Sequence, residues 1–402
     1  MEKQEGHNLR VVMIDGQDEA RQALLEVGAD RGGARWMSSK AVYRLIRVKQ
    51  LKSKAAVILK QEMLSRGGEA ALNRGVGNFS AEETDVLLMG TLRQYDELCK
   101  KIKMQPFGLR RLADEIKETL DNYDKREKRT LRCRDRSLSL GERTLVMGIL
   151  NVTPDSFSDG GKFFDTGAAV EHAHQMVEDG ADIVDLGGES TRPVTWSEEP
   201  LSAAEEIRRI MPVLERLLQE VKVPVSVDTY KAETARAALD AGAHMVNDIW
   251  GFQRDPGIAA VAAEYDVPVI LMHNQEGTEY QDLMGDLLAS LRRSVGVALD
   301  AGVPEDQVII DPGIGFGKDA QQNLIVLHRL RELRSLGKPI LLGASRKSTI
   351  GKVLNLPADQ RLEGSLATVV WGVAQDAADI VRVHDVKETA RAVRMTEAIV
   401  SG

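Results

Sequence analysis

The feature that most constrains the fold is a repeated alternation of short β-branched strands and amphipathic helical stretches from Leu145 onward. Eight strands are predicted, at 145–150, 182–187, 223–228, 244–249, 267–272, 306–311, 338–343 and 379–384. An open doubly wound sheet has fewer repeats and carries a glycine fingerprint after its first strand, where this sequence has Asn-Val-Thr-Pro. The repeats therefore predict an α/β protein whose last two-thirds forms a closed (β/α)8 TIM barrel.

Residues 1–136 break this rhythm and are predicted to form a small α/β domain ahead of the barrel at 137–402. A strand is expected at 10–14 and helices at 17–28, 40–66 and 81–103. No nucleotide-binding motif is present, because the segment GADRGGAR (28–35) lacks the strand and helix that flank a phosphate loop. We expect this domain to be an oligomerisation or regulatory module, with a second enzyme as the alternative.

Charge is divided unevenly along the chain, because residues 1–140 carry a net charge of +7 and the remainder carries −15. The field of an acidic barrel repels phosphates, so general nucleic-acid binding is not expected. The basic run 125–136 (KREKRTLRCRDR) lies in an expected linker at about 124–136. We expect it to be solvated or to rest against the acidic barrel, and a nucleic-acid patch is the alternative.

The sequence indicates neither a secreted nor a membrane protein. Its start, MEKQEGHNLR, has no apolar stretch behind a basic segment, and no apolar run approaches the roughly 18 residues of a membrane helix. The two cysteines, Cys99 and Cys133, are too few for a disulfide framework and lack the spacing of metal ligands. The expected location is therefore the reducing cytoplasm.

Polar residues cluster just past the carboxyl end of one predicted strand after another. They are Asn151, Glu189 to Arg192, Asp228, Asn247, Asp248, His273, Asp311, Ser345 to Ser348, Arg382 and His384. The carboxyl ends of all strands in a barrel form one ring, so these side chains are expected to meet at a single active site. The alternative for any one of them is that it merely caps the following helix.

Three of these residues, Asp228, Asn247 and Asp311, are suited to anchor one heterocycle, because a carboxylate accepts from a 2-amino group and a ring N–H together. The alternative is an internal carboxylate–amide network that braces the barrel. The segment 311–318 (DPGIGFGK) is not a phosphate loop, because no Gly-Lys-Ser/Thr stands at the required spacing. Its glycines instead let the backbone approach a ligand, with Phe316 as an apolar wall.

Zinc chemistry is disfavoured by the placement of the histidines. His172 and His174 stand i,i+2 on a predicted helix and do not face each other, and His273 and His384 lack positioned carboxylates. Mg²⁺ held partly by a substrate diphosphate fits better, because such an ion keeps several waters and needs only one protein ligand. Asn151 is the candidate for that ligand.

Seven motifs, in order and at the predicted strand ends, resemble the signatures of the dihydropteroate synthase family of pterin-binding barrel enzymes. They are MGILNVTPDSFSDGG (147–161), DLGGESTRP (185–193), VDTYK (227–231), VNDI (246–249), DPGIGFGK (311–318), GASRKS (343–348) and RVHD (382–385). The resemblance covers about residues 141–400. One mild departure is Asn274, where many members of the family carry an apolar residue.

The resemblance implies a transferase of folate biosynthesis, from a family targeted by sulfonamides. Such an enzyme joins 6-hydroxymethyl-7,8-dihydropterin diphosphate to 4-aminobenzoate and releases 7,8-dihydropteroate and diphosphate. It also implies Mg²⁺ as cofactor and a homodimer. The implied site residues are Asp155, Thr191, Arg192, Lys347, Arg382 and His384 for catalysis; Asp228, Asn247, Met272, Asp311, Phe316, Lys347 and Arg382 for the pterin; Phe157, Pro193, Phe316, Lys347 and Ser348 for 4-aminobenzoate; and Asn151, Arg382 and His384 for the diphosphate, with Asn151 also binding Mg²⁺.

These implied roles suggest a mechanism without an enzyme nucleophile. Diphosphate departs as Mg²⁺, Arg382 and His384 neutralise its developing charge. The aniline nitrogen then attacks a pterin methyl cation, which Asp155 and the carboxylates of the pterin site stabilise. Two loops, carrying Asp155 and Arg192, are expected to close and to exclude water from the cation.

Two other functions are weighed against this one. A corrinoid-linked methyltransferase that uses methyltetrahydrofolate shares the barrel and its pterin-binding aspartates, but a methyl carrier needs no diphosphate pocket. The motif that begins at Met147 and the Arg382-Val-His384 segment therefore argue against it. A non-catalytic scaffold predicts gaps in the ring of polar residues, and the sequence has none there.

Overall fold

The computed structural model describes residues 7–78, 80–125, 128–152, 165–189 and 201–401. The chain divides into two compact units, and the division falls between Lys125 and Arg126. The second unit therefore begins within the basic segment that the sequence suggested as a linker, ahead of the boundary predicted at 136/137.

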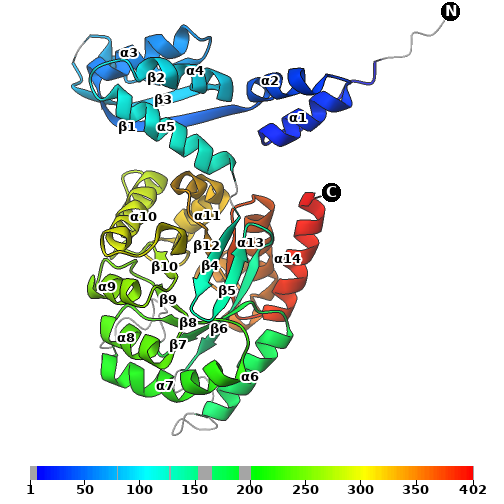
Figure 1. Ribbon diagram of the computed structural model, residues 1–402, viewed down its shortest axis with the longest axis vertical. Helices are drawn as coiled ribbons and strands as arrows, with labels where there is room; N and C mark the ends of the chain where they lie inside the picture. The colour runs from blue at the N-terminus through cyan, green and yellow to red at the C-terminus, as the bar shows by residue number, and fades with distance from the viewer. Residues whose placement is uncertain (1–6, 79, 126–127, 153–164, 190–200, 402) are drawn as a thin grey trace, which may run out of the picture. The chain divides into compact units, whose positions relative to one another are not determined.

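The second unit is a closed parallel barrel (Figure 1). Its strands are β6 (Leu145–Asn151), β7 (Ile183–Gly187), β8 (Val225–Asp228), β9 (Met245–Asp248), β10 (Val269–Met272), β11 (Val308–Asp311), β12 (Leu341–Leu342) and β13 (Ile380–Val383). They pair in the order β11-β10-β9-β8-β7-β6-β13-β12, and a parallel bridge between Ile310 and Ile340 joins the two ends of this order. All eight predicted strands are present, and the predicted TIM barrel is confirmed.

Helices on the outside of the barrel connect the strands (Figure 1). They are α6 (Thr166–Glu178), α7 (Ala203–Glu220), α8 (Ala232–Ala241), α9 (Gly257–Glu264), α10 (Leu283–Asp300), α11 (Ala320–His328), α12 (Ser348–Leu354), α13 (Leu362–Ala374) and α14 (Val386–Ser401). The sequence did not predict α9 or α12, which are the two shortest. In the described parts of the chain, no helix combines the length and the apolar character needed to cross a bilayer.

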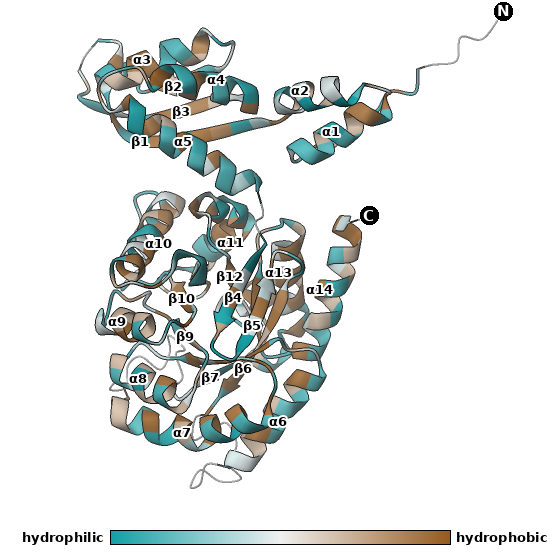
Figure 2. Ribbon diagram, in the orientation of Figure 1, coloured by the Kyte–Doolittle hydropathy of each residue, from teal (hydrophilic) through white to brown (hydrophobic). Residues whose placement is uncertain are grey.

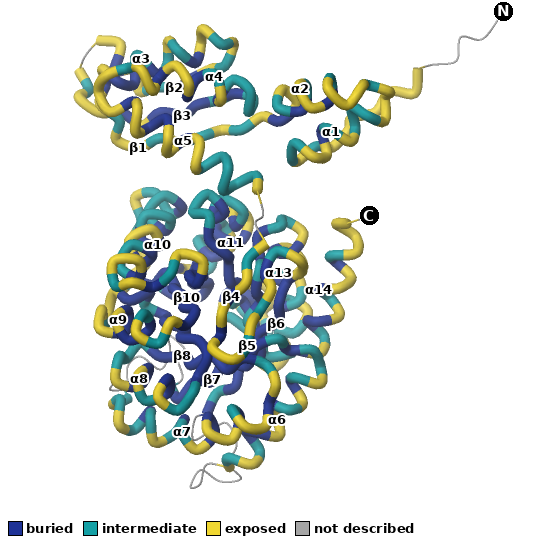
Figure 3. The backbone as a smooth tube through the Cα atoms, in the orientation of Figure 1, coloured by how far each residue is buried: buried dark blue, intermediate teal, exposed yellow. Residues whose placement is uncertain are grey.

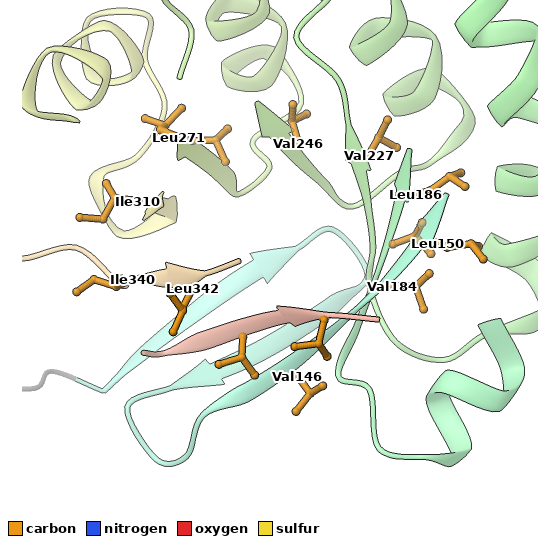
Figure 4. Close-up of a cluster of buried hydrophobic side chains, with 14 of the residues drawn as sticks. Val146, Leu150, Val184, Leu186, Val227, Val246, Leu271, Ile310, Ile340 and Leu342 are labelled. Atoms are coloured by element: carbon orange, nitrogen blue, oxygen red, sulfur yellow. The ribbon is translucent and has the colours of Figure 1, made fainter. Parts of the chain in front are cut away.

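Strand residues that point outward form the main hydrophobic core with the helices. Figure 4 shows such side chains, among them Val146, Val184, Val227 and Leu271, on successive strands of the barrel. The strands are almost entirely buried, while the outer faces of the helices are exposed and more hydrophilic (Figures 2 and 3). Successive strand residues point to opposite faces, so every second residue is left to line the barrel interior.

The interior of the barrel is apolar at the amino ends of the strands. One cluster of buried residues there combines inward strand side chains with side chains of an added hairpin, β4 (Arg129–Cys133) and β5 (Arg136–Leu140). The cluster consists of Leu131, Cys133, Leu140, Leu145, Met147, Ile183, Met245, Ile270, Ile309, Leu341 and Ile380. The hairpin thus closes the amino-terminal end, and the inward carboxylates and amides described below lie between the middle of the strands and their carboxyl ends.

Residues 129–136 of the basic segment predicted as a linker belong to this hairpin, which rests against the barrel. Arg129 donates to the carbonyl of Gly337 at 2.8 Å, and Arg134 donates to the carbonyl of Leu239 at 2.6 Å. Arginine side chains near the last carbonyls of a helix satisfy acceptors that the helix leaves open. Of the two expected environments for this segment, solvent or the barrel surface, the structure therefore shows the barrel surface.

The first unit is a small α/β fold, as predicted, but several of its elements differ from the prediction. They are α1 (Gln17–Glu26), α2 (Arg31–Ala41), β1 (Tyr43–Lys52), α3 (Ser53–Leu64), β2 (Glu69–Leu72), β3 (Glu83–Thr91), α4 (Leu92–Ile102) and α5 (Leu109–Asp124). The sheet is antiparallel in the order β1-β3-β2, and α3, α4 and α5 share its core.

Three assignments in this unit were wrong. Residues 43–52 and 83–91 are strands where helices were predicted, and 10–14 is not a strand. In β1 and β3 the burial alternates with a period of two, because one face of the sheet packs on helices and the other, with Tyr43 and Leu45, is exposed. Pairing within the sheet and packing against the helices outweighed the local helical pattern.

Candidate active site

Four neighbouring strands place one residue each in a single row across the carboxyl end of the barrel. In the strand register Asn151 pairs with Gly187, Gly187 with Asp228, and Asp228 with Asn247. A Cβ built on Gly187 would lie 3.3 Å from Oδ1 of Asn151 and 3.8 Å from Oδ2 of Asp228. The Asn151 carboxamide and the Asp228 carboxylate therefore approach each other across a position that has no side chain.

Arg382, which points inward from β13, joins two carboxylates of this interior. Its Nε donates to Oδ2 of Asp185 at 2.6 Å, and its Nη2 donates to Oδ2 of Asp228 at 2.6 Å. Nδ2 of Asn247 donates to the same oxygen of Asp185 at 3.1 Å. These side chains form the buried carboxylate–amide network that the sequence held open as an alternative to ligand binding. The internal network and ligand binding are compatible, because the network leaves carboxylate oxygens of Asp185 and Asp228 without a donor from the described part of the chain.

Asp185 was not among the predicted site residues. It stands two residues before Gly187 on β7, so the period of the strand turns both toward the interior. An aspartate at an inward position in the middle of a barrel strand was the signal that could have identified it. Its side chain is fully buried.

Two buried carboxylate oxygens of this network have no hydrogen-bond donor among the described residues: Oδ1 of Asp185 and Oδ1 of Asp228. A buried acceptor left unpaired costs free energy, and in a native site it indicates an incoming donor. Burial raises the pKa of Asp228 to about 7, against the opposing effect of Arg382. Burial lowers the pKa of Arg382, but Asp185 and Asp228 raise it above its ordinary value, so the guanidinium stays charged.

Asp311, at the end of β11, contributes a third carboxylate. Its Oδ1 accepts from the backbone N–H of Gly313 at 2.7 Å, while Oδ2 lies toward Gly343, where an added Cβ would be 3.5 Å away. Burial raises the pKa of Asp311 to about 6, against the opposing effects of the Gly313 N–H and Lys347. Gly313 must be glycine, because its φ is +68° and a Cβ there would lie 2.0 Å from the carbonyl oxygen of His273.

Lys347 and Phe316 form the edge of the cluster. The Lys347 Nζ lies 4.0 Å from the centre of the Phe316 ring, a cation–π distance. The aliphatic stem of Lys347 crosses Gly315, since a Cβ on that glycine would meet Cδ of the lysine at 2.9 Å. Phe316 also packs with Met272 and Ile249 in a small apolar cluster. A cation and an apolar wall thus stand side by side, as the sequence suggested.

His384 is held by Ser345, which lies in the loop after β12. The His384 backbone N–H donates to Oγ of Ser345 at 3.2 Å, and the same Oγ lies 3.0 Å from Nδ1 of the His384 ring. This pair of contacts fixes the orientation of the His384 ring. When Oγ donates its hydrogen to Nδ1, the proton of a neutral His384 ring lies on Nε2.

The loop after β11 also contains a buried lysine that the sequence analysis did not single out. Nζ of Lys318 lies 2.9 Å from Nδ1 of His273 and 3.1 Å from each of the carbonyl oxygens of Gly313 and Phe316. His273, predicted as a polar residue of the ring, therefore points at this lysine. The signal was a lysine at the end of a glycine-rich segment without the serine or threonine of a phosphate loop.

The structure gathers most of the predicted site residues at this end of the barrel. Those positioned there are Asn151, Asp228, Asn247, Met272, Asp311, Phe316, Lys347, Arg382 and His384; Ser348 is exposed and begins α12. The predicted residues Asp155, Phe157, Thr191, Arg192 and Pro193 lie outside the described residues. Asp248 has a local role, although not that of a helix cap, because it accepts from the backbone N–H groups of Trp250 and Phe252 in the turn after β9.

No group of three or more His, Cys, Asp or Glu side chains suited to a metal ion occurs among the described residues. The Asn151 carboxamide oxygen at the end of β6 is a hard donor of the kind that Mg²⁺ takes, and the neighbouring Asp228 adds negative charge.

Comparison with known proteins gives concordant results. The sequence model of the pterin binding enzyme family matches residues 147–384. A dihydropteroate synthase of Clostridium beijerinckii is 53% identical over 265 residues, which cover 66% of this chain and 97% of that protein. A crystal structure of a dihydropteroate synthase from Clostridium difficile, determined in the presence of pteroic acid, is 53% identical with a TM-score of 0.62, covering 65% of this chain and 98% of that one.

Longer relatives also match the first unit. A probable bifunctional folylpolyglutamate synthase/dihydropteroate synthase of Halobacterium salinarum is 40% identical over 398 residues, which cover 97% of this chain. The match covers 47% of that protein, so this chain is similar to about half of its length. The arrangement of a small unit with a barrel is thus shared with a longer relative.

Proposed function

The chain belongs to the pterin-binding enzymes and, within them, to the dihydropteroate synthase family, and on this premise we propose how its described residues divide the work of the reaction. The enzyme is a transferase of folate biosynthesis: it joins 6-hydroxymethyl-7,8-dihydropterin diphosphate to 4-aminobenzoate and releases 7,8-dihydropteroate and diphosphate. The observation that carries the assignment of the site is the pair of unused buried oxygens on Asp185 and Asp228, beside an arginine that donates to the other oxygen of each carboxylate.

The pterin ring binds across the row of side chains at the barrel mouth. Asp228 Oδ1 accepts from the 2-amino group or ring N–H, because Oδ2 is already occupied by Arg382. Asn247 and Asp311 complete the polar edge, and Met272 packs against the ring face. A buried acceptor without a donor has a free-energy cost. A ligand that supplies the donor removes this cost and therefore binds more tightly.

The diphosphate leaves on the side of Arg382 and His384. Nη1 of Arg382 has no partner among the described residues, and the contact with Ser345 involves Nδ1 of His384 rather than Nε2. Asn151 would hold Mg²⁺ together with diphosphate oxygens and water, and the ion would neutralise charge on the leaving group. Fixed donors that meet the developing charge lower the barrier to departure.

The 4-aminobenzoate binds at the edge formed by Phe316 and Lys347, with Ser348 beside its carboxylate. The benzene ring packs on Phe316, and Lys347 borders both substrates. Asp155, Phe157, Thr191, Arg192 and Pro193 are assigned to the two loops around this end of the site by their motifs alone. The aniline nitrogen attacks the pterin methylene carbon as the bond to diphosphate breaks, so no covalent enzyme intermediate forms.

Two further proposals concern the whole molecule. We propose that the enzyme is a homodimer and that the first unit is an interaction or regulatory module. Its three-stranded sheet has an exposed face with Tyr43 and Leu45, and none of the predicted site residues lies in it. The mass in solution of the full chain, compared with that of residues 126–402, tests both statements.

The experiment that tests the function is a coupled assay on the full chain. We expect diphosphate release that depends on 4-aminobenzoate and on Mg²⁺, and competition by a sulfonamide. Methyl transfer from methyltetrahydrofolate to a corrinoid, without such release, would instead indicate the methyltransferase. The Arg382 and His384 pair favours the synthase, because a methyl carrier has no diphosphate to bind.

A further inference from the structure

One buried charged group near the site has no part in the reaction as described above. Lys318 is only 8% exposed, and burial lowers its pKa to about 7, although Asp311 opposes that change. A buried ammonium is retained only where its hydrogens are satisfied. Lys318 meets this condition through three acceptors rather than through a carboxylate partner.

The three acceptors come from two different segments of the chain. The carbonyl oxygens of Gly313 and Phe316 lie in the lysine's own loop, each 3.1 Å from Nζ, and Nδ1 of His273 follows β10 at 2.9 Å. An ammonium has three hydrogens and no acceptor, so Nδ1 of His273 must accept and its ring proton must lie on Nε2. Burial and the adjacent Lys318 lower the pKa of His273 to about 3, which keeps the ring neutral.

The loop that Lys318 holds in place carries Phe316, which is assigned to the 4-aminobenzoate site, and contacts Lys347. Phe316 lies under the Lys347 ammonium at 4.0 Å, and Gly315 gives passage to the stem of the same lysine. A second tie comes from buried Asn323, whose Oδ1 accepts from the Gly315 N–H at 2.8 Å. The backbone at Gly315 and Phe316 is thus held by Asn323 and by Lys318. These two residues in turn position the side chain of Lys347, which contacts both of them.

We propose that Lys318 is a positioning residue for the aminobenzoate end of the site: its buried ammonium binds the Gly313 and Phe316 carbonyls to His273 and thereby holds Phe316 against Lys347. This inference rests on the proposed function, because that function assigns Phe316 and Lys347 to the second substrate. Asp228 and Asn247, at the pterin end, belong to strands that Lys318 does not contact. Of the pterin residues on the strands, Asp311 is linked to this loop through the Gly313 N–H, whereas Asp228 and Asn247 are not. We therefore expect loss of the Lys318 contacts to affect 4-aminobenzoate more than the pterin.

The test compares Lys318→Met with a matched control, Lys338→Met. Both lysines are buried, at 8% and 7% exposure, but Lys338 precedes β12 and pairs with Glu305 at the amino-terminal end of the barrel. Methionine keeps the length of the stem and removes every donor. We expect Lys318→Met to raise the KM for 4-aminobenzoate about 10-fold while the KM for the pterin diphosphate changes less than about threefold, since misplacement by about an ångström has effects of this size or larger.

A second readout is independent of turnover. Amide hydrogen exchange at Phe316, whose N–H donates to the Gly313 carbonyl at 3.1 Å, should become at least about 10-fold faster in Lys318→Met and stay unchanged in Lys338→Met. Lys318→Arg, which keeps the charge but carries its donors in a planar fork, should restore only part of the KM effect.

The outcomes separate the two proposals. Inactivity of the unaltered chain would contradict the proposed function, and the exchange measurement would still decide whether Lys318 holds the loop. Equal changes in both KM values, the same change in Lys338→Met, or unaltered exchange at Phe316 would each overturn the role of Lys318. A selective KM effect together with faster exchange supports it.

Discussion

Nη2 of Arg382 lies 2.6 Å from Oδ2 of Asp228, although 154 residues separate the two in sequence. The contact spans the interior of the barrel, from β13 to β8, and Arg382 also reaches Asp185 on β7. Three strands are thereby joined through one guanidinium. The first prediction below follows from these contacts of Arg382 with Asp185 and Asp228.

Replacing Arg382 by methionine should cost both stability and activity. Asp185 and Asp228 would be left as buried carboxylates without a cation, and breaking a buried ion pair from one side costs about 3–5 kcal/mol. We expect a lower urea midpoint and a loss of kcat/KM of about 100-fold or more, because a donor to the leaving group disappears as well. Arg208→Met, on the exposed surface of α7, is the control. An Arg382 variant as stable as that control would show that the pair is not what holds the network.

The affinity for a pterin should fall as the solution is acidified through the pKa of Asp311. Burial raises this pKa to about 6, so the carboxylate that accepts from the ligand is lost below that value. The sign for stability is the opposite: a folded-state pKa above the unfolded one means that ionisation of Asp311 costs stability as the pH rises from about 4 to about 6. The dissociation constant of pteroate, measured between about pH 5 and pH 8, should rise toward low pH. Asp228, whose pKa burial raises to about 7, contributes to the upper part of this rise, and Asp311→Asn should flatten the part below about pH 6. An unchanged slope in Asp311→Asn would assign the titration to another group.

Lys347→Met should reduce turnover far more than Phe316→Leu. The methionine retains the apolar stem over Gly315 and removes only the ammonium that borders both substrates. Preorganised charges at a reacting centre are typically worth about 100-fold or more in kcat. Phe316→Leu keeps the wall apolar and should act mainly on the KM for 4-aminobenzoate. Steady-state kinetics with each substrate varied in turn distinguish the two, and near-normal turnover in Lys347→Met would contradict its placement.

Ser345→Ala should weaken catalysis by changing which ring nitrogen of His384 carries the proton. A serine hydroxyl that donates to Nδ1 favours the tautomer with the proton on Nε2, and without this hydroxyl both tautomers become accessible. A loss of about 10-fold in kcat/KM with little change in the melting temperature is expected, and Ser345→Thr, which retains the hydroxyl, should recover most of it. NMR of the ring nitrogens of His384 reports the tautomer directly. Unaltered nitrogen shifts in Ser345→Ala would refute the assignment.

The hairpin should be indispensable to the barrel, whereas the first unit should not. A chain that starts at residue 126 keeps Leu131, Cys133 and Leu140 in the core at the amino-terminal end, and a chain that starts at 141 loses all three. Burying one such side chain contributes about 1.5–3 kcal/mol. We expect the 126–402 chain to fold and to form dihydropteroate, and the 141–402 chain to unfold at lower temperature or to aggregate. Equal melting temperatures for the two would contradict the role of the hairpin.

The barrel could be predicted from sequence because its strands repeat and their period of two determines which residues point inward. The same argument places Asn151, Asp228, Asn247 and Asp311 at one end before any contact is known. It would also have identified Asp185, two residues before Gly187. In the first unit the prediction was weaker, since β1 and β3 are half-exposed strands whose identity depends on partners far along the chain.

The sequence alone could not show which side chains form hydrogen bonds with one another. Arg382 was assigned to the pterin and the diphosphate through its motif. In the structure, two of its nitrogens donate to carboxylates on two other strands. Lys318 was read as the end of a glycine-rich segment, because nothing local reveals that three acceptors converge on it. Such contacts depend on rotamers and on the closure of the barrel.

The most direct test of the central claim, that the polar side chains at this end of the barrel carry out dihydropteroate synthesis, is the rate of 7,8-dihydropteroate formation by the full chain and by Asp228→Asn. Asparagine has nearly the same shape, but it replaces one carboxylate oxygen with an amino group and removes the charge. We predict product formation by the unaltered chain and a fall in kcat/KM of about 100-fold or more in the variant, with its melting temperature lowered only modestly. No product from the unaltered chain, or a fully active Asp228→Asn, would contradict the claim.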